Sequence, residues 1–238
     1  MSSEESAIEK SLELLEEGAD SELAEAIPYF EKAYKAYRWV KSWRMKCFIK
    51  SLGKAAESLG EREKQRLDEI IASQEGAELL TQYADSVLKT SSKTAITALA
   101  LLYADQDDST YSEEFKRQAC TSLDGISDHE VGFFLELLNA CENMRDDQYS
   151  DSPYPLYDLA QVEEKSASLN NLEESYEEKV VIVNSLIRRG ILLPKYGMRL
   201  PVVKSEEEEK SPMFEFGVPK WSNRLAHLLQ EAENYRDL

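Results

Sequence analysis

One stretch of the chain, residues 91–138, most constrains the fold. Its residues 95–103 are apolar at nearly every position, and a helix with apolar residues on all sides must be surrounded by other elements. Ser91 or Ser92 can cap the start of this helix, because a serine oxygen accepts hydrogen bonds from first-turn backbone amides. The polar residues 105–110 can end it. The pattern therefore predicts a buried central helix.

A second core helix is expected a short way along the chain. Ser127 and Glu130 stand three residues apart directly before an apolar run, which is the spacing of a capping box. We therefore expect five side chains from these two helices to be buried together. They are Ile96, Leu99, Leu102, Phe134 and Leu138.

Composition sets limits on class and location. The chain has 238 residues, of which 42% are hydrophobic, enough for a substantial core. Its three cysteines are widely spaced, so they indicate neither a disulfide framework nor a metal motif and fit a reducing compartment. Glutamates lie where a signal peptide needs basic and apolar residues, and no run reaches membrane length. A cytoplasmic protein is expected.

The charge is distributed unevenly. The formal net charge of -18 and the pI near 4.6 oppose long-range attraction to nucleic acid. Residues 28–54, however, hold eight lysines and arginines against the single acid Glu31, which makes this segment +7. Seven tyrosines, tryptophans and phenylalanines are interleaved with these bases. The bases can form a solvated face that complements the acidic helices, or they can bind an acidic protein, a membrane surface or nucleic acid.

The candidate partner-binding residues follow from this distribution. Four come from the basic segment and two from the end of a later helix. They are Lys35, Arg38, Lys41, Arg44, Arg188 and Arg189.

We predict a mainly α fold in which a multi-helix bundle is followed by a small winged-helix-like α+β module. The bundle is expected over residues 1–145. Residues 146–171 contain prolines, aspartates and serines, and predict a linker with a short helix near residues 156–162. The module is expected over residues 172–238.

Within that module, Asn171 is the expected cap of a helix that ends at Gly190, since glycine accepts the left-handed conformation after a helix. Short strands are predicted at residues 191–193, 196–203 and 213–216. Pro219 is expected to open the last helix.

The phrases "LIRRGILLP" and "FGVPKWSNRLAHLLQEA" resemble the C-terminal half of a winged-helix domain. Together with the apolar spacing over about residues 67–231, they resemble the Abi-alpha type of bacterial proteins, which are linked to abortive phage infection. Trp221 and Ser222 stand where the winged-helix pattern usually has threonine, so the chain departs from that pattern there. The resemblance implies a helical bundle with a winged-helix-like tail in a prokaryotic or phage-encoded protein. It transfers no catalytic residues.

The sequence indicates no catalytic, cofactor-binding or metal-binding residues. Oxygen-bearing side chains alternate from Asp105 to Glu113 as in a calcium loop, but Thr110 and Lys116 replace its required glycine and glutamate. His129 and His227 are the only histidines and lie far apart in sequence. Nucleotide-binding, hydrolase and zinc-protease motifs are absent from the sequence.

The leading hypothesis is therefore a non-enzymatic interaction or regulatory protein that acts through protein contacts, with a link to phage defence implied by the resemblance. The first alternative is a DNA-binding regulator that uses the winged-helix-like module. The glutamates at 173, 174, 177 and 178 and at 206–209 disfavour it, since they would repel phosphate. The second alternative is an enzyme without a familiar motif.

Overall fold

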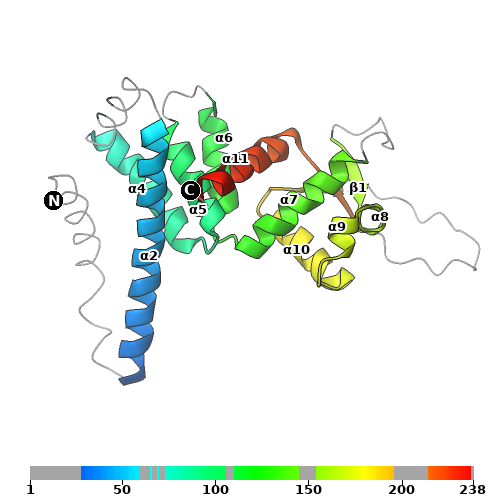
Figure 1. Cartoon of the computed structure of the whole chain (residues 1–238), viewed down its shortest axis with the longest axis horizontal. Coiled ribbons are helices and arrows are strands. Elements are labelled where there is room, and N and C mark those ends of the chain that lie inside the picture. The colour runs from blue at the N-terminus through cyan, green and yellow to red at the C-terminus, as the bar shows by residue number, and fades with distance from the viewer. Residues whose placement is uncertain are drawn as a thin grey trace, which may run out of the picture. The chain divides into compact units, whose positions relative to one another are not determined.

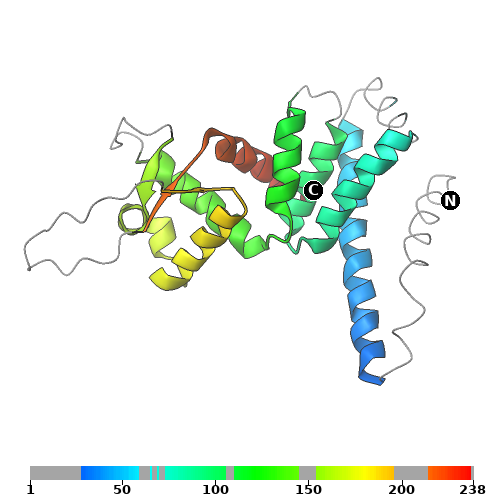
Figure 2. The same cartoon turned by 180° about the vertical axis from the view of Figure 1, so that it is seen from behind.

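The computed structural model describes residues 28–58, 65, 69, 73–105, 110–144, 154–195 and 214–236. It is mainly helical, with a small three-stranded antiparallel sheet. The chain groups into two units, Met1–Trp43 and Arg44–Leu238. Figures 1 and 2 show the elements of the second unit from opposite sides.

The described helices of the first part of the chain begin at serine caps, except for the first of them, which starts at Pro28. They are α2 (Pro28–Ser58), α4 (Gln74–Lys89), α5 (Lys93–Ala104), α6 (Glu113–Leu123) and α7 (Asp128–Glu142). Ser92 caps α5 by accepting from the Ala95 amide. Ser127 and Glu130 form the predicted capping box of α7.

Helix α5 is the centre of the second unit, as its apolar sequence predicts. It contacts α4, α6, α7 and α11 (Lys220–Arg236). Ile96, Leu99, Leu102 and Phe134 are completely buried and Leu138 nearly so, in one hydrophobic core, which confirms the expectation that these five are buried together.

The later elements alternate between helix and strand. They are β1 (Leu156–Asp158), α8 (Leu159–Lys165), α9 (Ala167–Asn170), α10 (Tyr176–Arg188), β2 (Leu193–Pro194), β3 (Glu215–Gly217) and then α11. Strand β3 lies between the other two, antiparallel to both, which gives the order β1-β3-β2.

Several local predictions need correction. Residues 156–162 were expected to be helical, but Leu156–Asp158 form a strand and α8 starts only at Leu159. Ser175, and not Asn171, caps α10. The strands near 191–193 and 213–216 are present but displaced, at Leu193–Pro194 and Glu215–Gly217. The strand predicted at 196–203 lies outside the described residues.

The predicted division at residues 146–171 differs from the grouping in the structure. Tyr157, Leu159, Val162 and Leu169 are buried in the same core as α5. Helix α7 contacts α5 and α11 as well as α8, α9 and α10. The elements on the two sides of the predicted linker therefore share one core within Arg44–Leu238.

Candidate interaction site

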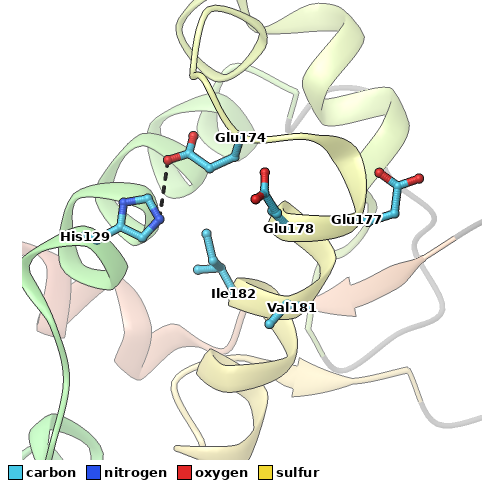
Figure 3. A pocket seen from close by; sticks show the side chains of 6 residues that line it. All are labelled: His129, Glu174, Glu177, Glu178, Val181 and Ile182. Atoms are coloured by element: carbon cyan, nitrogen blue, oxygen red, sulfur yellow. Dashed lines mark ion pairs between the residues drawn. The ribbon is translucent and has the colours of Figure 1, made fainter.

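A hollow of about 340 Å³ lies between the start of α7 and the first half of α10. Figure 3 shows the side chains that surround it. They are His129, Glu174, Glu177, Glu178, Val181 and Ile182.

Helix-start chemistry explains part of this acidic lining. Ser175 and Glu178 form a capping box, in which the Ser175 amide donates to Glu178 Oε2 at 2.8 Å. Carboxylates in a first turn also interact favourably with the positive end of the helix dipole, which accounts for Glu177. Glu174 precedes the cap and has neither role.

Glu174 pairs with the histidine of α7. His129 Nε2 lies 3.3 Å from Glu174 Oε1, and this contact is an ion pair when the imidazole is protonated. The other carboxylate oxygen, Glu174 Oε2, is buried and has no hydrogen-bond partner among the described residues. His129 itself is 56% exposed in its side chain. Solvent therefore reaches the hollow on the side of His129.

The apolar part of the hollow comes from two successive residues. Val181 is 67% exposed, and it is the one large hydrophobic side chain of the described residues that stands out in this way. The neighbouring Ile182 is 8% exposed and belongs to the core. The hollow therefore has one exposed and one buried apolar side chain in its lining.

Helix α10 is held firmly behind this surface. Lys179 is almost completely buried, and its Nζ donates to Glu163 Oε1 at 2.6 Å and to the Leu169 carbonyl at 2.8 Å. A buried lysine is tolerated when it is paired and hydrogen-bonded in this way. The carboxylate and carbonyl tie α10 to α8 and α9, so the hollow is built on a fixed scaffold.

The C-terminal end of α10 is anchored by Arg189. Its guanidinium donates to the carbonyls of Asp124 and Gly125, and its Nε lies 3.5 Å from Glu130 Oε1. Gly190 follows with a φ of 70°, the left-handed conformation predicted for the end of this helix.

The six candidate partner-binding residues differ in their exposure and in whether other residues of the fold already bind them. Arg44 donates to the Leu88 carbonyl of α4, and Arg189 is occupied as described, so both are engaged within the fold. Arg188 is exposed. Lys41 is half-buried, in the first unit. The side chains of Lys35 and Arg38 lie outside the described residues.

The hollow could have been found only in part from the sequence. The acids at the start of α10 are apparent in the sequence, where they disfavour DNA binding but do not indicate a hollow. The run Val180–Val183 holds four successive apolar residues, which cannot all face one side of a helix. This excess was the available signal for an exposed valine. The approach of His129 to Glu174, 45 positions apart in the numbering, had no local signal.

Two absences concern only the residues that the structure describes. Among those residues, no group of three or more histidines, cysteines or acids is placed to hold a metal ion. None of the described helices has the length and apolar character needed to cross a bilayer.

No family model, curated protein or solved structure matches the chain. The resemblance to Abi-alpha proteins therefore stays a prediction.

Proposed function

We propose that the described elements from α7 to β3 form a winged-helix-like module, which begins earlier in the chain than the residues 172–238 expected for it. We further propose that this module binds another protein through α10, and that the chain is a non-enzymatic interaction or regulatory protein. The order α7, β1, α8 with α9, α10, β2 and β3 supports this proposal, as does the sheet order β1-β3-β2. In a winged helix, the helix that precedes the second strand is the one that enters the DNA major groove. Here that helix is α10.

The chemistry of α10 favours protein over DNA. Glu177 and Glu178 are exposed at its N-terminal end, and Glu174 lies directly before it. A DNA-binding helix must approach phosphates, and binding gains most of its affinity when lysines and arginines replace the counterions of DNA. Glutamates at this position repel the phosphates instead. Val181 is exposed one helical turn after Glu177 and Glu178, and this is the observation that carries the proposal, because protein interfaces combine an apolar centre with a polar rim.

Location and biological setting are part of the same proposal. The three cysteines Cys47, Cys120 and Cys141 are free thiols, which supports a reducing compartment such as the cytoplasm. The link to phage defence depends only on the sequence resemblance. A gene position among defence or prophage genes would support that link, and a position in a metabolic operon would contradict it.

Site-specific crosslinking in the native host tests the protein-binding role. A photoreactive phenylalanine at position 181 should give a discrete crosslinked species, whereas the same residue at the exposed position 118 of α6 should not. Equal crosslinking at both positions would contradict a role for α10.

The DNA alternative is tested directly by fluorescence anisotropy with a labelled duplex at low salt. Non-specific DNA binding has dissociation constants of roughly 10⁻⁴ to 10⁻⁶ M, and it weakens steeply as salt increases. We expect no salt-sensitive binding in this range. Salt-dependent binding that Glu177→Lys strengthens would identify α10 as a DNA-binding helix and overturn the proposal.

A further inference from the structure

The hollow combines an apolar surface with an acidic rim, and this combination limits what can occupy it. We propose that it receives an apolar side chain from a cationic amphipathic helix of a partner protein, whose basic residues meet the exposed Glu177 and Glu178. This inference rests on the proposed function and specifies the chemistry of the partner.

The apolar contact supplies the anchor. Val181 is 67% exposed, whereas the neighbouring Ile182 is buried in the core. An aliphatic or aromatic side chain of the partner can therefore pack against Val181 without displacing Ile182. The volume of about 340 Å³ has room for such a side chain. An amphipathic helix that places its apolar face in a groove is a recurring mode of peptide recognition.

The charges specify the sign of the partner. Three carboxylates line the hollow, against His129 as the single basic residue, and His129 already faces Glu174. Potentials across specific interfaces are complementary, so a partner with lysines or arginines beside its apolar anchor is favoured. An acidic segment is repelled for the same reason.

The exposed stripe of α10 also gives the partner a direction. Val181 and Arg188 are seven positions apart, so they lie on the same side of the helix, and both are exposed. The stripe therefore runs from negative at Glu177 through apolar at Val181 to positive at Arg188. The basic residues of the partner belong at the N-terminal end of α10.

Binding of a defined peptide tests the inference. The probe is a fluorescein-labelled peptide of about 14 residues, composed of leucine and lysine with the leucines along one helical face. The full-length protein is titrated into it, and anisotropy is followed at low and high salt. We expect binding that weakens with salt. We also expect that binding becomes weaker by roughly fivefold or more in Glu177→Lys and in Val181→Ser.

The chain provides a closely matched control for the charge change. Glu114 is exposed and is the second residue of α6, as Glu177 is of α10. Glu114→Lys therefore makes the same change in net charge and in helix-dipole interaction without touching the hollow. It should bind the peptide as the unmodified protein does. Circular dichroism confirms that each variant is folded, and Glu177→Gln replaces Glu177→Lys if the latter is not.

Each result supports or overturns the inference. No binding to the unmodified protein, or equal weakening by Glu177→Lys and Glu114→Lys, would show that the hollow does not select cationic helices. If a peptide with serine in place of leucine bound as tightly, binding would not depend on an apolar side chain, which would overturn the inference. A dimer of this chain that Glu177→Lys dissociates would assign the hollow to a second copy and overturn the inference. The crosslinking and DNA measurements test whether α10 binds protein, and the peptide measurements test which partner it binds, so the two failures can be told apart.

Discussion

At the residue scale, Glu130 connects the start of α7 to the C-terminal part of α10. Its Oε2 accepts from the Ser127 amide at 2.9 Å, and its Oε1 accepts from the Ser185 hydroxyl at 2.5 Å. Burial alone would raise the pKa of this carboxyl. The hydrogen bonds from Ser185 and Ser127, together with the positive charge of Arg189, outweigh burial and lower the pKa of Glu130 below its ordinary value.

This lowered pKa predicts a pH-dependent contribution to stability. A carboxyl with a lower pKa in the folded state stabilises fully above its ordinary pKa of 4.5, and the effect is lost as the pH falls through the folded-state pKa. Glu130→Gln should therefore lower the free energy of unfolding at pH 7 by about 1–3 kcal/mol, and by clearly less near pH 3. Urea denaturation at both pH values measures the change, with Glu164→Gln on the surface of α8 as the control. A loss that is equal at both pH values would contradict the ionic role of Glu130.

A second residue-scale prediction concerns Gly217 in β3. A Cβ at this position would overlap the ring of Tyr154, so only glycine allows the tyrosine to lie against the strand. Gly217→Ala should destabilise the protein by about 1–3 kcal/mol, the usual cost of overpacking. In a Tyr154→Ala background the same substitution should cost much less. Thermal denaturation of the two single variants and the double variant gives this comparison, and additive effects would show that the ring contact is not the cause.

At the scale of elements, α5 is the helix on which the second unit depends. It contacts α4, α6, α7 and α11, and Leu99 at its middle is completely buried. Leu99→Ala should lower the free energy of unfolding by about 2–5 kcal/mol, because it removes buried methyl groups and leaves a cavity. The urea midpoint should decrease strongly for this variant, and hardly at all for Gln118→Ala on the exposed side of α6. An unchanged urea midpoint for Leu99→Ala would show that α5 is not part of the hydrophobic core.

Helix ends that depend on residues a few positions away could be predicted from the sequence. A strand that forms only by pairing with a distant strand could not. The caps at Ser92 and Ser127 and the glycine after α10 depend on chemistry within a few residues, and the structure contains all three. Strand β1 was missed because its hydrogen-bonding partner is β3, about 60 residues later. With only three residues, β1 has no periodicity of its own to reveal it.

The same distinction applies to the candidate site. Arg44 and Arg189 are basic residues of the kind that bind an acidic partner. In the structure, however, backbone carbonyls elsewhere in the fold accept their hydrogen bonds. Carbonyls exist at every residue, so no sequence pattern shows which of them an arginine will meet. The negative charge at the start of α10 was readable directly, because it lies in consecutive residues of one helix.

At the scale of the whole molecule, the described parts on both sides of residues 145–153 are joined through α7 and α11. Helix α11 follows the sheet in sequence, yet it packs on α5. Its Leu225, Leu228, Leu229 and Ala232 are completely buried. Burying one leucine side chain contributes about 1.5–3 kcal/mol, so these residues supply a large share of the stability.

Cutting the chain between Met144 and Tyr154 tests whether the two sides are separate domains. A protease site inserted there would produce one fragment with α5 and α7 and another with α10 and α11. We expect the fragments to elute together in native size-exclusion chromatography, because α11 covers α5 on one side and α7 contacts α8, α9 and α10 on the other. After separation in urea, neither should refold alone, since each would expose the apolar residues that the other covers. Mixing the two during refolding should restore the helical circular dichroism signal. Two fragments that separate and each unfold cooperatively would instead support the division into a bundle, a linker and an independent module.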